Sequence, residues 1–121
     1  MAVNYGSKRE VVGAHYGTRD WLAQRVTAAL MAVFTLVVLL QVIFSRGPIG
    51  YEKWAGIFAS QPMKMLTFAT ILGLAYHAWV GMRDVLMDYV KPVGARLVLQ
   101  FLVIVWLLGC MGWAIQVLWR V

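Results

Sequence analysis

The sequence predicts an all-α membrane protein with three transmembrane helices. Of its 121 residues, 62% are hydrophobic and only 13% are charged, whereas soluble domains average about 45–50% apolar and about 25% charged residues. Three long segments carry no charge: the 20 residues between Arg25 and Arg46, the 18 between Lys64 and Arg83, and the 23 between Arg96 and Arg120. As helices they would extend roughly 27–35 Å, which matches a hydrocarbon core of about 30 Å. Because lipid offers the backbone no hydrogen-bond partner, each segment is expected to be helical.

The first span is expected over about residues 21–44, after a polar arm at residues 1–20. Asp20 is expected to cap this helix, and the sequence Arg46-Gly47-Pro48 is expected to close it, because glycine and proline interrupt helices. The loop that follows carries aromatic residues suited to the headgroup layer and is a candidate for a short interfacial helix.

The second span is expected over about residues 63–90 and the third over about 93–119. Pro62 suits the first turn of a helix, and Pro92 disfavours the helical conformation at Lys91. No internal repeat separates the chain into halves, so residues 1–121 are interpreted as a single membrane-anchor domain.

Charge and cysteine content exclude several classes of function. The net charge of +6 does not indicate a nucleic-acid partner, because the basic residues are scattered on both sides of the spans. Cys110 is the only cysteine and lies within a span, so there is no disulfide framework, iron–sulfur motif or zinc site. Seven basic residues on one side against four on the other favour a cytoplasmic N-terminus and an external C-terminus: Lys8, Arg9, Arg19, Arg25, Arg83, Lys91 and Arg96 against Arg46, Lys53, Lys64 and Arg120.

His77 is the most informative residue, because it lies about 9 Å inside Arg83 along an apolar helix. A titratable side chain at that depth usually points toward a partner or a cofactor. Gly73 and Gly81 fall about 40° to either side of His77, leaving a trough with room for a porphyrin. The alternative is a contact between helices through small residues, with His77 hydrogen-bonded across it.

Carboxylates and a phenol continue the second span toward its C-terminal end. Asp84 and Asp88 lie within about 20° of the His77 direction, and Tyr89 lies about 18 Å farther along the axis. A phenol and a carboxylate there fit a proton-coupled quinone site, but an aromatic belt with solvated charges is an equally ordinary explanation. Arg25 fits either a pairing with a propionate or quinone group or a plain snorkelling charge, and His15 is interpreted as a surface residue of the arm.

The motifs HAWVGM at 77–82 and DYVKP at 88–92 resemble the hydrophobic membrane anchor subunit of bacterial succinate dehydrogenase (respiratory complex II). The His-x10-Asp-Tyr spacing is the hallmark of that family. Further similarity covers QRVTA at 24–28, YEKWAGIFAS at 51–60 and ARLVLQ at 95–100, so the resemblance extends over about residues 20–110.

The resemblance implies roles for individual residues. His77 matches the axial ligand of the iron of a b-type haem, Tyr89 the phenol that hydrogen-bonds ubiquinone, and Asp88 its acidic neighbour. Arg25 matches an arginine near the haem propionates or the quinone pocket. The family would place the chain in the bacterial inner (cytoplasmic) membrane, where electrons from succinate pass through flavin and iron–sulfur clusters to ubiquinone. The Arg83-Asp84 pair is less typical of the family, and no role is transferred to Asp84.

One intramembrane histidine implies partners, because a bis-histidine haem would need its second ligand from another polypeptide. The chain also lacks a dinucleotide fingerprint and a cysteine cluster, so it cannot oxidise succinate alone. We therefore expect its helices to form part of a hetero-oligomeric helical bundle, with a second haem-ligating anchor subunit, an iron–sulfur subunit and a flavoprotein. The alternatives are a purely structural anchor without cofactor, a transporter or channel subunit, and an anchor for fumarate reduction.

Overall fold

A computed structural model describes residues 14–121, and their side chains from residue 17 onward. Four helices follow one another: α1 (Ala14–Ile43), α2 (Tyr51–Ala59), α3 (Gln61–Tyr89) and α4 (Val93–Trp119). Helices α1, α3 and α4 are long and apolar enough to cross a membrane. The described residues contain no strand, and the prediction of an all-α protein with three candidate spans is confirmed.

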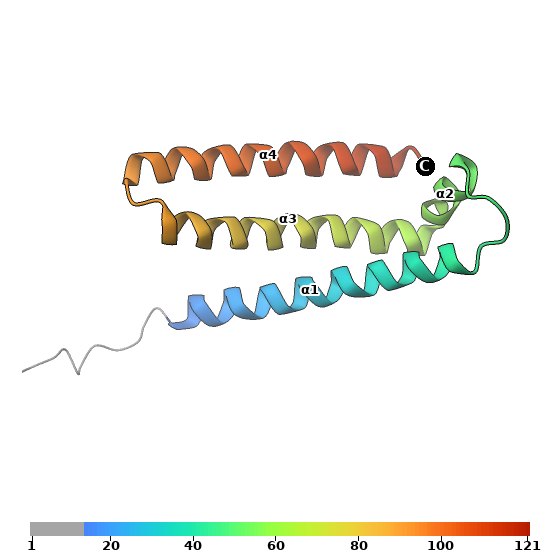
Figure 1. The fold of residues 1–121 in the computed structure, drawn as a ribbon, viewed down its shortest axis with the longest axis horizontal. Coiled ribbons are helices and arrows are strands. Elements are labelled where there is room, and N and C mark those ends of the chain that lie inside the picture. Colours follow the sequence, from blue (N-terminus) through green and yellow to red (C-terminus); the bar gives the residue numbers. More distant parts are fainter. Residues whose placement is uncertain (1–13) are drawn as a thin grey trace, which may run out of the picture.

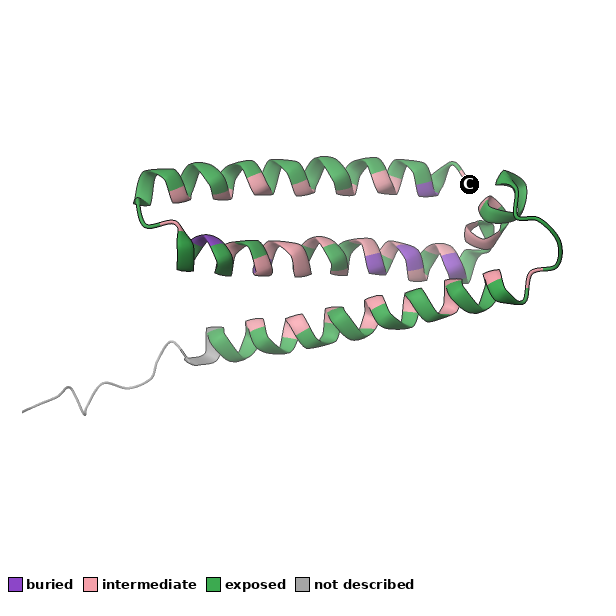
Figure 2. Cartoon of the chain, viewed as in Figure 1, coloured by how far each residue is buried: buried purple, intermediate pink, exposed green. Residues whose placement is uncertain are grey.

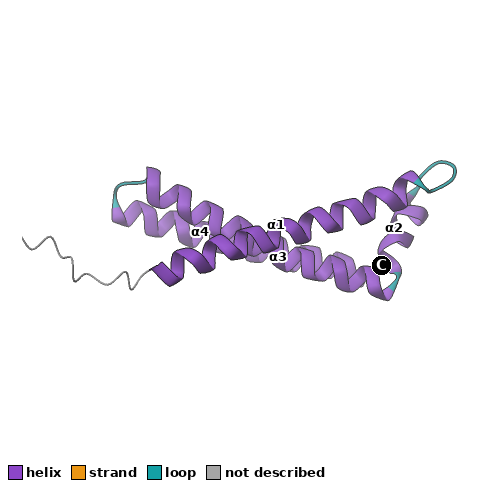
Figure 3. Ribbon diagram, turned by 90° about the horizontal axis from the view of Figure 1, so that it is seen from below, coloured by secondary structure: helices purple, strands orange, loops and turns teal. Residues whose placement is uncertain are grey.

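Helix α3 is the centre of the arrangement. It packs against α1 on one side and α4 on the other, and α2 rests on its N-terminal end (Figure 1). Seen at right angles to this view, α1 crosses α3 obliquely (Figure 3). Any site between spans of this chain therefore lies on a face of α3.

Helix α1 begins earlier than the sequence suggests. It includes Ala14, although the polar arm was expected to continue to residue 20. Extending a helix costs little once a long apolar segment has nucleated it, and Gly17 alone does not interrupt it. The prediction that Asp20 caps the first span is wrong, because Asp20 lies within the helix. The remainder of the arm, residues 1–13, and the side chain of His15 lie outside the described part.

The other helix boundaries agree with the sequence to within about two residues. Helix α1 ends at Ile43, and Gly47 adopts a φ of 80°, a left-handed conformation that glycine takes without steric cost. Helix α2 confirms the short helix expected after this turn. Helix α3 has Pro62 in its first turn and ends at Tyr89, and α4 spans the residues expected for the third span.

The described chain buries little of its own apolar surface (Figure 2). Its buried apolar side chains are Met63, Val80, Leu86 and Leu118. The outward faces of α1 and α4 are almost wholly exposed, as expected of helices that meet lipid or neighbouring subunits. The core is thus confined to the two faces of α3, and the rest of the surface is available to lipid or partner chains.

Candidate functional site

His77 lies on the face of α3 that packs against α1. Its imidazole is half-buried, and its Nδ1 atom lies 3.0 Å from Oγ1 of Thr27 on α1. The described residues offer no hydrogen-bond partner to Nε2, and this atom is not among the buried polar atoms without a partner. One ring nitrogen is therefore held inside the chain, and the other reaches its surface.

Thr27 is anchored to its own helix. Its hydroxyl donates to the carbonyl oxygen of Ala23 at 2.6 Å, and the carbonyl oxygen of Gln24 is 3.2 Å away. A hydrogen bond from the threonine hydroxyl to the carbonyl one turn earlier restricts rotation of the side chain. The imidazole of His77 thus meets a hydroxyl oxygen whose position is set by α1.

The glycines beside His77 face α1. A Cβ atom added at Gly73 would lie 3.2 Å from Cδ2 of Leu30 and 3.7 Å from Cγ2 of Thr27. At Gly81 the nearest heavy atom would be Nε2 of Gln24, at 3.9 Å. Around these glycines the trough expected from the sequence is therefore filled by α1, as in the helix contact through small residues. A planar ligand on His77 would have to approach from the open side, at Nε2.

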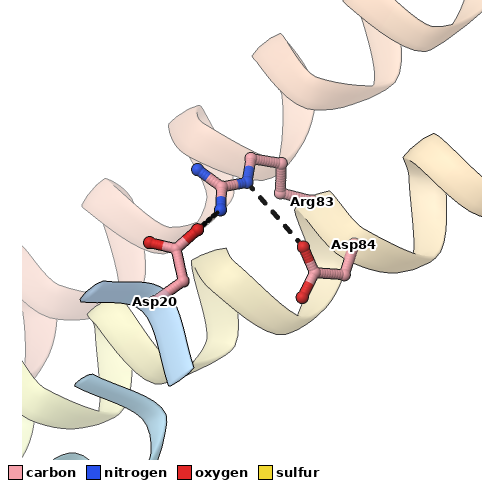
Figure 4. A network of polar contacts seen from close by, with 3 residues as sticks. All are labelled: Asp20, Arg83 and Asp84. Carbon is pink, nitrogen blue, oxygen red and sulfur yellow. Dashed lines mark hydrogen bonds and ion pairs between the residues drawn. The ribbon is translucent and has the colours of Figure 1, made fainter. Parts of the chain in front are cut away.

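An ion pair links α1 and α3 at the end of α3 that leads to α4. The guanidinium of Arg83 donates to a carboxylate oxygen of Asp20, and its Nε atom lies 4.0 Å from Oδ1 of Asp84 (Figure 4). The side chains of Arg83 and Asp20 are 31% and 27% exposed, while that of Asp84 is 61% exposed. Arg83 and Asp20 therefore form a structural tie, with Asp84 at its edge.

Arg25 lies on the exposed side of α1. Its guanidinium carbon is 5.3 Å from the ring centroid of Trp21, one turn earlier. Stacking of this kind leaves the N–H groups of arginine free to bind an anion. Arg25 is two residues before Thr27 along α1, but no described contact joins it to His77.

Asp88 and Tyr89 lie at the C-terminal end of α3, beyond the ion pair. Both side chains are exposed, and that of Tyr89 is 79% exposed. No described contact joins either residue to Arg25 or His77. Within the described part of the chain, these two side chains therefore line no enclosed pocket together with Arg25 or His77.

The described residues contain no group of three or more His, Cys, Asp or Glu side chains that could hold a metal ion. Cys110 is a free, exposed thiol on α4. The buried hydroxyls of Thr67 and Thr70 donate to carbonyl oxygens within α3, so they are already satisfied. His77 is thus not part of a multi-residue metal cluster within the described residues.

Two features of the site are absent from the sequence interpretation. Thr27 is the contact of His77, and Asp20 is the partner of Arg83. The sequence could have identified Thr27 as a candidate, because Gln24 and Thr27 are polar residues one turn apart in an apolar span and share a helix face. Asp20 gives no comparable signal, because its partner lies 63 residues away.

Comparison with known proteins identifies the family of the chain. Residues 4–111 match the family described as succinate dehydrogenase/fumarate reductase transmembrane subunit. The chain is also 39% identical over 103 residues to the succinate dehydrogenase hydrophobic membrane anchor subunit of Coxiella burnetii (strain RSA 493 / Nine Mile phase I), a match that covers 85% of this chain and 89% of the relative. With three candidate spans and a match over most of its length, the chain belongs to the family of succinate dehydrogenase/fumarate reductase transmembrane subunits and is a membrane anchor subunit.

Proposed function

We propose that this anchor subunit ligates a b-type haem through Nε2 of His77 and helps to form a ubiquinone-reduction site at the C-terminal end of α3. The observation that carries the proposal is the state of the imidazole. It lies in the middle of an apolar span, with Nδ1 held by Thr27 and Nε2 without a hydrogen-bond partner among the described residues. A side chain of this kind is costly in lipid and calls for a ligand or a partner.

The residues around His77 fit an axial ligand better than a closed metal site. A histidine that ligates a haem iron offers one ring nitrogen to the metal, and its second ring nitrogen normally donates to an oxygen. His77 meets both conditions, since Thr27 supplies the oxygen at Nδ1. When bound, the haem would supply reversible one-electron chemistry next to the quinone site.

The open side of His77 supports a haem shared between two chains. Nε2 reaches the surface of this subunit, and the described spans offer no second imidazole. The other axial ligand would then come from a second anchor subunit. That subunit would also cover part of the exposed apolar surface of α1 or α4.

Tyr89 and Asp88 would act on ubiquinone at the end of the bundle. Reduction of a quinone to a quinol requires two electrons and two protons. The phenol of Tyr89 can donate a hydrogen bond to a quinone carbonyl, and the carboxylate of Asp88 can relay protons from water. Both side chains are exposed in this chain, so partner subunits would complete the pocket and deliver the electrons.

Arg25 is assigned to the haem propionates or to the quinone pocket. Its guanidinium stacks on Trp21 and keeps its N–H donors free, and a guanidinium binds a carboxylate in a two-pronged geometry. Loss of this charge should weaken the binding of an anionic group without removing the axial ligand.

The distribution of basic residues supports a bacterial inner-membrane orientation with the N-terminus in the cytoplasm and the C-terminus in the periplasm. In this orientation the end of α3 that carries Tyr89 faces the cytoplasm. The iron–sulfur subunit and the flavoprotein would dock there. Electrons from succinate would then reach the quinone through their cofactors.

The proposal is tested with the His77→Ala variant of the purified complex. We expect the b-type haem band in the reduced-minus-oxidised spectrum to be lost or strongly altered while the subunits still co-purify at least in part. His15→Ala is the matched control, because it changes the other histidine of the chain, and it should keep the band. An unchanged band in His77→Ala would instead indicate a purely structural anchor.

A further inference from the structure

We infer that Thr27 is the positioning residue of the haem ligand. Its hydroxyl oxygen accepts a hydrogen bond from Nδ1–H of His77, and this fixes the tautomer that presents the lone pair of Nε2 outward. The inference rests on the proposed ligation by His77 and adds the residue that prepares the imidazole for it.

The direction of this hydrogen bond follows from counting hydrogens. A threonine hydroxyl has one hydrogen and two lone pairs. The carbonyl oxygens of Ala23 and Gln24, at 2.6 Å and 3.2 Å from Oγ1, can only accept. If the hydroxyl hydrogen pointed at His77 instead, two oxygen acceptors would face each other at 2.6 Å with no hydrogen between them. The hydroxyl hydrogen of Thr27 therefore points toward the carbonyl oxygens, and Nδ1–H of His77 donates the hydrogen bond to Oγ1 of Thr27.

This direction determines which ring nitrogen can bind iron. A neutral imidazole carries its proton on one nitrogen and a lone pair on the other. With the proton on Nδ1, the lone pair lies on Nε2, the atom that reaches the surface of the chain. Nε2 would then be able to ligate iron through this lone pair without loss of a proton.

Gly73 allows Thr27 to reach His77. The methyl carbon of Thr27 and the end of Leu30 lie within 3.7 Å of the position that a Cβ of Gly73 would occupy. A larger residue at 73 would push α1 away from α3. The methyl group of Thr27 thus packs on Gly73, and its hydroxyl lies between two carbonyls and the imidazole, so both substituents of Cβ are held in place.

Two substitutions of Thr27 distinguish the effect of its hydroxyl group from the effect of its branched shape. Thr27→Val keeps the branched side chain that packs on Gly73 but removes the acceptor for Nδ1–H. Thr27→Ser keeps the hydroxyl and removes only the methyl group. Both variants are compared with the parent in the assembled complex, by haem content, by redox titration of the haem band and by the response to salt or detergent washing.

We expect Thr27→Val to retain haem about 10–100-fold more weakly than the parent, the usual effect of losing such a supporting hydrogen bond. Its haem potential should move in the positive direction, because an imidazole without this bond is a weaker electron donor to ferric iron. Thr27→Ser should stay close to the parent in both measurements. A merely structural threonine would not move the potential and would not be rescued by serine.

The tautomer is measured without haem, in the full chain in lipid bilayers, by ¹⁵N NMR of labelled histidine. His15→Gln leaves His77 as the single histidine signal. The expected spectrum has a protonated Nδ1 and an unprotonated Nε2 in the parent, and a mixture of tautomers in Thr27→Val. A parent spectrum with the proton on Nε2 would overturn the inference.

The two proposals fail in different ways. If His77→Ala keeps its haem band, ligation by His77 is wrong, and the NMR spectrum still decides the tautomer. If His77→Ala loses haem while Thr27→Val matches the parent in haem content and potential, only the role of Thr27 is wrong. Equal loss of haem in Thr27→Ser and Thr27→Val would also contradict the positioning role of Thr27.

Discussion

Arg83 and Asp20 tie the C-terminal part of α3 to the N-terminal part of α1 (Figure 4). The contact between His77 and Thr27 repeats this pairing about two turns deeper, in the same antiparallel register. Two polar contacts on one helix face fix how far α1 can slide along α3. The ion pair near the membrane boundary therefore helps to hold the hydroxyl of Thr27 in front of the imidazole.

The ion pair should contribute modestly to stability and measurably to the haem site. Asp20→Asn and Arg83→Gln should each lower the thermal stability of the solubilised complex, and a double-mutant cycle should give a coupling of about 1 kcal/mol, typical of a partly exposed pair. Asp84→Asn is the control, because this carboxylate is more exposed and lies farther from the guanidinium. Strictly additive effects of the two substitutions would show that the pair contributes nothing.

Gly73 should tolerate only the smallest substitution. Gly73→Ala places a methyl group 3.2 Å from the flexible end of Leu30, so the cost of the contact is offset by the higher helix propensity of alanine, worth about 1 kcal/mol. Gly73→Leu should separate α1 from α3 and release the haem. Gly109→Leu on α4 is the comparison, since no atom lies within 4 Å of its Cβ position. Equal haem retention in the two leucine variants, measured by the haem to protein ratio, would refute this packing argument.

Tyr89→Phe removes one hydroxyl and should slow quinone reduction by about tenfold, which corresponds to a loss of about 1.4 kcal/mol of transition-state stabilisation. Succinate oxidation with an artificial electron acceptor should persist, because that reaction bypasses the quinone site. Tyr51→Phe is a matched control: both tyrosines are 79% exposed, but Tyr51 lies on α2 at the other end of the bundle. Equal loss of both activities in Tyr89→Phe would indicate an assembly defect.

Asp88→Asn should lower the rate of quinone reduction more than Asp84→Asn does. Both carboxylates are exposed and lie one turn apart on α3, and they differ in that Asp84 lies 4.0 Å from the Arg83 guanidinium. Only Asp88 adjoins Tyr89, where the proposed quinone site would require a proton relay. Steady-state rates with a soluble ubiquinone analogue measure the difference, and identical rates in the two variants would remove Asp88 from the site.

The spans follow from the sequence because lipid constrains them so strongly. A charge-free run of about 20 residues has to form a helix, and Pro62, Pro92 and Gly47 lie within four residues of helix ends in the structure. The start of α1 was missed because a polar helical turn outside the membrane carries no such constraint. The assignment of Asp20 as a cap was wrong for the same reason.

The sequence could predict only the part of the site that lies on a single helix. Helical geometry places Gly73, His77 and Gly81 on one face of α3, and the structure shows that α1 covers the glycines on this face. Which neighbour fills a face is a tertiary property, so an open trough and a close helix contact could not be distinguished from spacing. Thr27 belongs to a different span, and only the crossing of α1 over α3 identifies it as the partner of His77.

The most direct test of haem ligation by Nε2 of His77, with the haem shared with a second anchor subunit, is an experimental density map of the assembled complex, purified from its membrane. We expect the porphyrin at the outward side of His77, its iron bonded to Nε2 and to a histidine of the other anchor subunit, with Nδ1 still within hydrogen-bond distance of Thr27. A map with no haem beside His77, or with iron on Nδ1, would contradict the account.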